Sequence, residues 1–153
     1  MSEMLGNRYF LARQFNNAIP YLEEALNQNP TGEKVKKKLI ICNIQTGHID
    51  KAFTLFYELV HNNPKVIIET DAYWDDCPCG ELIPLWEKKV DENKDSLEYL
   101  ITLGMLNLYC NLEKSRLYFN QAIPYSDNPA KIQSVLGGLF RQCAEKIQIG
   151  IPW

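Results

Sequence analysis

The sequence predicts an all-α fold built from stacked pairs of helices. It repeats with a period of 34 residues, which places Ala18 on Ala52 and Pro30 on Pro64. Within each period the apolar residues recur every three or four positions, which is the spacing of one face of an α-helix. Polar residues, Gly and Pro interrupt the helical stretches where the chain has to turn. A period of this length is typical of arrays in which each repeat is a pair of helices.

The first unit, residues 2–30, contains two predicted helices separated by a polar break. Leu5 belongs to the apolar face of the first helix and Leu22 to that of the second. We expect Asn16 to cap the second helix, because an Asn side chain can accept a hydrogen bond from a free amide at a helix start. Pro30 ends the pair, since proline cannot continue a helix.

The second unit, residues 31–64, follows the same plan. Gly47 supplies the break between its helices, and Asp50 is the expected cap of a helix over residues 51–60. Pro64 closes this unit as Pro30 closes the first.

The period is less regular beyond residue 64. The third unit, residues 65–94, is predicted to have a short or irregular first helix and a second helix over about residues 80–93. Residues 83–87, Ile-Pro-Leu-Trp-Glu, echo residues 19–23, Ile-Pro-Tyr-Leu-Glu, of the second helix of the first unit. This likeness favours the second helix of a third pair.

The fourth unit, residues 95–129, is clearer. Ser96 is the expected cap of its first helix, and Phe119 lies on the apolar face of its second. Residues 130–153 follow, with an apolar stripe that includes Leu139. Because a repeat array exposes an apolar face at its end, we expect this stretch to form a capping helix. All units together are predicted to form one domain of residues 1–153.

These units resemble the tetratricopeptide repeat family. The resemblance implies a right-handed superhelix of about four helix pairs plus the capping helix, with a concave groove lined by the first helix of each pair. The groove of this family holds a segment of a partner protein, so the expected function is that of a non-catalytic interaction module. The residues that carry the resemblance are Leu5, Gly6, Tyr9, Phe15, Ala18, Leu22, Ala25 and Pro30 in the first unit, and Leu39, Gly47, Ala52, Phe56 and Pro64 in the second.

The resemblance also predicts which residues line the groove. Lysines there would steer acidic groups or a terminal carboxylate of the partner, and apolar residues would supply contact area. The alternative is that the lysine-rich start of the helix is a solvated face. One subgroup of the family binds the terminal carboxylate of chaperone tails through Lys, Arg and Asn side chains. In this sequence Asn7 matches one of those residues, but Glu3 replaces a required lysine. The predicted groove residues are Asn7, Phe10, Leu11, Lys34, Lys37, Lys38, Ile41, Gln45 and Leu100.

Composition excludes several other classes of protein. The 153 residues include 16 Lys and Arg against 19 Asp and Glu, for a net charge of −3. This balance gives no basic field for nucleic acid or anionic lipid. No apolar run is long enough to span a membrane, and the first ten residues do not resemble a secretion signal. The number of cysteines is five, which is odd, so we do not expect a disulfide framework. We expect the protein to be located in the cytoplasm.

The segment around Cys77-Pro78-Cys79 is the alternative candidate site. Two thiols so close together could bind a soft metal or form a redox pair. No further ligands stand at a recognisable spacing, and the neighbouring Asp75 and Asp76 would raise the pKa values of the thiols. Structural packing at a turn between helices is the reading that we favour, so neither a metal nor a cofactor is predicted. The aromatic pair Tyr73-Trp74 is interpreted in the same way.

No motif for catalysis is present. The sequence has neither a glycine-rich phosphate loop nor a nucleophile elbow, and Cys42 lies in an apolar run where a thiol is inert. A third alternative is a self-associating module, a homodimer that buries Trp153 or the apolar face of Leu97, Leu100 and Ile101. The sequence therefore predicts no enzyme, and a protein partner.

Overall fold

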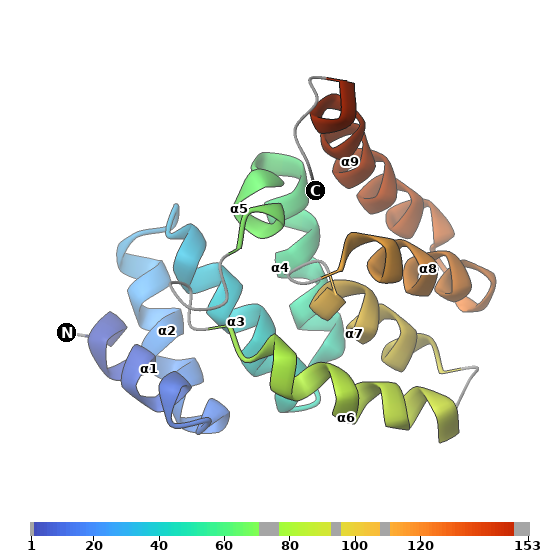
Figure 1. Ribbon diagram of the computed structural model, residues 1–153. Coiled ribbons are helices and arrows are strands. Elements are labelled where there is room, and N and C mark those ends of the chain that lie inside the picture. Colours follow the sequence, from blue (N-terminus) through green and yellow to red (C-terminus); the bar gives the residue numbers. More distant parts are fainter. Residues whose placement is uncertain (1, 71–76, 93–95, 108–110, 149–153) are drawn as a thin grey trace.

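The computed structural model describes residues 2–70, 77–92, 96–107 and 111–148, with the backbone alone for residues 140–148 (Figure 1). Within these ranges the chain forms α-helices and one 3-10 turn, and no strand, which confirms the all-α class. The elements are α1 (Ser2–Leu11), α2 (Phe15–Gln28), α3 (Glu33–Gln45), α4 (Ile49–Asn62), α5 (Lys65–Ile68), α6 (Cys79–Glu92), α7 (Leu97–Asn107), α8 (Leu112–Ala122), η1 (Ile123–Tyr125) and α9 (Pro129–Gln148).

Three helix pairs form the body of the molecule. The helices α1 and α2, α3 and α4, and α7 and α8 pack against each other, and α3 also packs on α2 of the preceding pair. None of the described helices is long and apolar enough to cross a bilayer. One continuous hydrophobic core runs through the array, as expected when neighbouring repeats bury each other's apolar faces.

The second helix of each pair presents one large side chain to its partner helix. Leu22, Phe56 and Phe119 are fully buried at these corresponding positions. Opposite two of them lies a glycine: a Cβ atom on Gly6 would come within 2.7 Å of Leu22, and one on Gly104 within 2.7 Å of Phe119. These glycines allow the paired helices to approach closely.

The first helices of two pairs each contain a buried asparagine side chain. Asn43 in α3 and Asn107 in α7 are each 1% exposed. Each side chain donates a hydrogen bond of 2.8 Å to the carbonyl four residues earlier, from Leu39 and Leu103 respectively. The bond satisfies a polar group that would otherwise be costly to bury. The unit formed by α7 and α8 therefore repeats the design of the unit formed by α3 and α4.

Two helix starts differ from the prediction. The second helices of the first two pairs begin at Phe15 and Ile49, and Gln14 and His48 precede them. Neither preceding residue caps its helix through its side chain. The predicted caps, Asn16 and Asp50, lie inside the first helical turn, because the chain enters each helix sooner than the polar pattern indicated.

The third pair is incomplete. Its first helix, α5, has four residues, and residues 71–76 lie outside the described part of the chain. The likeness of residues 83–87 to 19–23 correctly predicted a helix, α6, which packs along α7 as α2 packs along α3. The short α5 leaves α4 in direct contact with α7, and Phe119 of α8 packs its ring at 6.0 Å from that of Phe56 in α4.

The last helix closes the array on the side of α4. As Figure 1 shows, α9 lies beside α4 and α8. Its apolar face buries Ile132, Val135 and Leu139. Lys131 at its start stands over the rings of Phe53 and Tyr57, at 5.0 and 5.3 Å from their centroids. The predicted tail residues 149–153, with Trp153, lie outside the described residues.

Candidate protein-binding surface

Four predicted groove residues lie at the surface of α1 and α3. Asn7 and Lys38 are half-buried, and Leu11 and Lys34 are exposed. The Lys38 ammonium donates a hydrogen bond of 2.9 Å to the Asn7 side-chain oxygen and lies 5.7 Å from the ring centroid of Phe10. This contact ties the second pair to the first and places a positive charge between their first helices.

Lys34 lines a shallow cleft of about 370 Å³ where the starts of α1 and α3 meet the loop after α2. Glu3 and Glu33 bring negative charge to the same cleft. The Glu33 carboxylate accepts a hydrogen bond of 2.9 Å from the Asn63 amide. Lys34 and Lys38 are four residues apart on one helix, so they lie on the same face.

Four other predicted groove residues are corrected by the structure. Phe10, Lys37, Ile41 and Leu100 are between 0% and 6% exposed and offer a partner almost no surface. The three residues in α3 and α7 are buried because helices pack on both sides of these two helices, and Phe10 in α1 is buried against Phe15. The alternative of self-association loses part of its basis for the same reason, since Ile101 is only 9% exposed.

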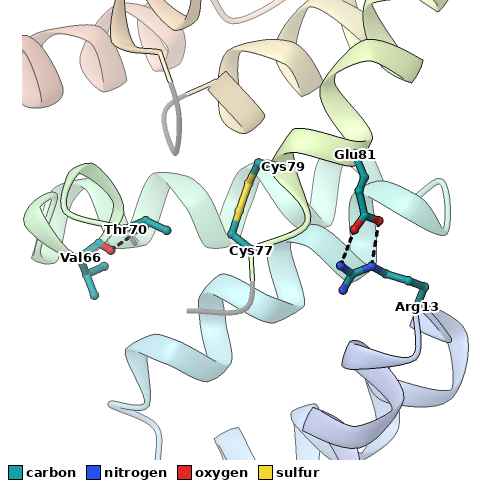
Figure 2. Close-up of a disulfide and its surroundings, with 6 residues drawn as sticks. All are labelled: Arg13, Val66, Thr70, Cys77, Cys79 and Glu81. Atoms are coloured by element: carbon teal, nitrogen blue, oxygen red, sulfur yellow. Dashed lines mark hydrogen bonds and ion pairs between the residues drawn. A yellow bond between two sulfur atoms is a disulfide. The ribbon is translucent and has the colours of Figure 1, made fainter. Parts of the chain in front are cut away.

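Helix α6 runs alongside α7 (Figure 1). It meets the turn after α1 through Glu81, whose carboxylate accepts two hydrogen bonds from Arg13, at 2.8 and 3.1 Å (Figure 2). It meets the end of α3 through Trp86, whose indole N–H donates a bond of 2.9 Å to the Gln45 side-chain oxygen. Gln45, the last of the nine predicted groove residues, is therefore engaged within the chain.

The same helix reaches the start of α8 through Glu87. Its carboxylate accepts a hydrogen bond of 3.2 Å from the Tyr118 hydroxyl and lies 3.6 Å from the Lys114 ammonium. Burial, followed by the charge of Glu87, raises the pKa of Tyr118 to about 12. Tyr118 therefore stays a neutral hydrogen-bond donor at physiological pH.

The Arg13 guanidinium lowers the pKa of Glu81, first by hydrogen bonding and then by its charge. Arg13 also has an unusual backbone, with φ of +61°. One period further along, Gly47 stands at the corresponding turn with φ of +83°. Glycine adopts this conformation freely, whereas other residues adopt it at a cost of about 1–2 kcal/mol.

Cys77 and Cys79 form a disulfide at the start of α6 (Figure 2). The sequence offered this pair as a thiol site and did not predict the bond. Cys79 is fully buried and Cys77 is half-buried, so they pack at the expected helix start. In this state neither sulfur is a thiolate that could bind a metal. The described residues contain no cluster of three or more His, Cys, Asp or Glu side chains placed to hold a metal ion.

Some predicted features lie outside the described residues, namely Tyr73, Trp74, Asp75 and Asp76. The sequence reasoning also missed Arg13, Glu81 and Glu87 as residues that fix α6. The only signal in the sequence was that the third unit is too short for two regular helices. This shortage could have indicated that the contacts of its second helix differ from those in the first two pairs.

The geometry defines the class of this chain as an α-helical repeat protein: helix pairs with matching buried positions stack in sequence. Residues 9–71, from the end of α1 to just beyond α5, match the family model described as tetratricopeptide repeat. The matched segment, in the N-terminal half of the chain, supports its assignment to the tetratricopeptide repeat family. No curated protein sequence matches it.

Proposed function

We propose that this protein is a non-catalytic adaptor that binds a segment of a partner protein at the surface of α1 and α3. Tetratricopeptide repeats generally mediate protein–protein interaction, which supports the coarser part of this proposal. The observation that carries the finer part is the position of Lys34 and Lys38. The first lines a cleft between the starts of two helices, and the second lies one turn further along, hydrogen-bonded to Asn7.

The partner segment is expected to carry acidic side chains or a terminal carboxylate. Two lysines on one helix face attract such groups and raise the association rate. Leu11, which is 54% exposed on α1, offers apolar contact area nearby. Because Glu3 and Glu33 also border the cleft, the segment must place its negative charge beside the lysines and away from these two carboxylates.

The test is a capture experiment from native lysate followed by direct affinity measurements with the retained protein. Lys34→Glu should lower the affinity at least tenfold, because it reverses the charge in the cleft. Lys88→Glu is the matched control, with the same charge change on an exposed residue of α6, and should retain the partner. Lys37 is left unchanged because it is buried. Equal binding by both variants would contradict the proposal.

A thiol-redox role for Cys77 and Cys79 is the second candidate, and the disulfide between them is the observation that favours it. An external dithiol would donate two electrons and two protons, leaving two thiols here and a disulfide on itself. Only Cys77 is partly open to such an attack. A Cys77→Ser, Cys79→Ser double variant that folds and retains its partner as well as the wild type does would rule out this role.

A further inference from the structure

We infer that a pocket between α2 and α4 binds a tyrosine side chain of a partner segment in which a basic residue stands next to that tyrosine. The pocket has a volume of about 390 Å³, which lies within the range of about 300–1,000 Å³ typical of sites that hold small ligands. It is separate from the cleft at Lys34, since the two share none of their lining residues in the described part of the chain.

The walls of the pocket are largely apolar. Leu26 of α2 and Leu55 of α4 line it and are half-buried, so part of each side chain is open to a ligand. Leu39 and Asn43 of α3 also line it, and they are only 2% and 1% exposed, so they form its inner end. Such a pocket suits a ligand with an apolar body and one polar group at its tip.

Asn43 supplies an unused hydrogen-bond acceptor at this inner end. Its side-chain N–H group donates a hydrogen bond of 2.8 Å to the Leu39 carbonyl. No described residue donates a hydrogen bond to its side-chain oxygen, Oδ1. A buried acceptor without a donor is costly, and most buried polar groups in proteins have a partner. A ligand that brings a hydrogen-bond donor to Asn43 therefore binds better than one that fills the pocket with carbon alone.

The first helix pair indicates that this ligand is aromatic. Tyr9 and Tyr21 stand one period before Asn43 and Leu55, and their rings stack with centroids 5.6 Å apart. In the second pair the same two positions carry shorter side chains without a ring, and both line the pocket. The pocket therefore lies where the first pair places its own aromatic rings. A tyrosine from a partner fills such a space with its ring and carries a hydroxyl donor at its tip.

The charges at the rim favour a basic residue beside the tyrosine. Glu23 of α2 and Lys51 of α4 border the pocket and form an ion pair of 2.8 Å, so their charges largely cancel. Asp50, exposed at the start of α4, adds a second carboxylate. This excess of negative charge attracts a lysine or arginine of the partner and repels a phosphorylated tyrosine.

The test compares two small molecules, 4-methylphenol, which is the side chain of tyrosine, and toluene, which lacks the hydroxyl. Each is titrated into the full chain, and the amide NMR signals of α3 and α4 report binding. Signals at Leu39 and Leu55 should shift with 4-methylphenol. In an Asn43→Leu variant the affinity for 4-methylphenol relative to toluene should fall about fivefold, because its hydrogen bond is lost. An unchanged ratio, or no shift in wild type, would overturn the inference.

Two further variants accompany this titration. Asn107→Leu is the matched control, because Asn107 is a buried asparagine of α7 with the same bond to the carbonyl four residues earlier, and it should leave the ratio unchanged. Asn43→Tyr gives the second pair the residue of the first. This variant should keep its helical circular dichroism and bind neither compound, since its own ring fills the pocket. Binding of 4-methylphenol to the folded Asn43→Tyr chain as to wild type would place the ligand elsewhere.

Dipeptides with blocked ends test the partner chemistry on the wild-type chain, without relying on any variant. Lys-Tyr should bind more tightly than Glu-Tyr and Lys-Phe, and Lys-phosphotyrosine should not bind. Equal binding of Lys-Tyr and Lys-Phe would contradict a hydrogen bond to Asn43, and equal binding of Lys-Tyr and Glu-Tyr would contradict the basic neighbour. Tighter binding of Lys-Trp would overturn the choice of tyrosine. None of these measurements involves Lys34 or a lysate partner, so their outcome is independent of the proposed function.

Discussion

Single glycines determine how closely the helices of a pair approach. Gly6 and Gly104 face Leu22 and Phe119, and a Cβ atom at either glycine would overlap the opposite side chain. The sequence marks Gly6 through its family resemblance. The need for a glycine at residue 104 follows from the packing, because it depends on where the ring of Phe119 lies.

Replacing Gly104 with Ala should therefore destabilise the protein by about 1–3 kcal/mol, which is the usual cost of overpacking. The measurement is urea denaturation followed by circular dichroism. Gly137→Ala is the matched control, because nothing lies within 4 Å of a Cβ atom there and the residue is in a helix. That variant should be more stable by up to about 1 kcal/mol. Equal stability of Gly104→Ala and wild type would contradict the packing.

The thiol of Cys42 should be inert in the folded protein. Burial raises the pKa of this thiol from 9.0 to about 12, so almost no thiolate exists near neutral pH. We expect iodoacetamide at pH 8 to leave Cys42 unmodified in buffer and to modify it in urea, as read by peptide mass mapping. Rapid modification of the native protein would show that α3 is more open than the structure describes.

At the scale of elements, α6 packs along α7 as α2 packs along α3. It is also joined to the turn after α1 and to α8 by exposed ion pairs. Conditions that weaken charge interactions should therefore loosen these two contacts of α6.

Acid should loosen α6 at its first contact. The pKa of Glu81 is lower in the folded chain than its ordinary value of 4.5, so this carboxylate stabilises the contact above pH 4.5. The stabilisation is lost as the pH falls below 4.5 and the carboxylate takes up a proton. Amide exchange of α6, compared with that of α3 and corrected for the intrinsic effect of pH, should rise in this range. A Glu81→Gln variant should lack the rise.

The whole molecule depends on a contact between pairs that are far apart in the sequence. Because α5 is a single short turn, α7 and α8 pack directly on α4, and Phe119 meets the rings of Phe53 and Phe56. This aromatic cluster joins the N-terminal repeats to the C-terminal part of the described chain.

Truncating Phe119 to Ala should lower the free energy of unfolding by about 3–5 kcal/mol, since it leaves a cavity between two pairs. Leu117→Ala on the same helix is the control: its side chain is 54% exposed, and the change should stay within about 0.5 kcal/mol. Denaturant unfolding of both variants gives the comparison. Equal effects would mean that the α4 and α8 pairs do not depend on each other.

The sequence by itself determined the all-α class, the two regular pairs and the helices that follow, because helical periodicity and turn residues are local features. It also indicated Lys34 and Lys38 as surface charges. Only the tertiary structure decided that Phe10, Ile41 and Leu100 are buried. It also decided that α6 is joined to other helices through Glu81, Trp86 and Glu87. Those outcomes depend on which helices pack against each other. A periodic pattern shows that one face of a helix is apolar, but it does not show which other helix covers that face.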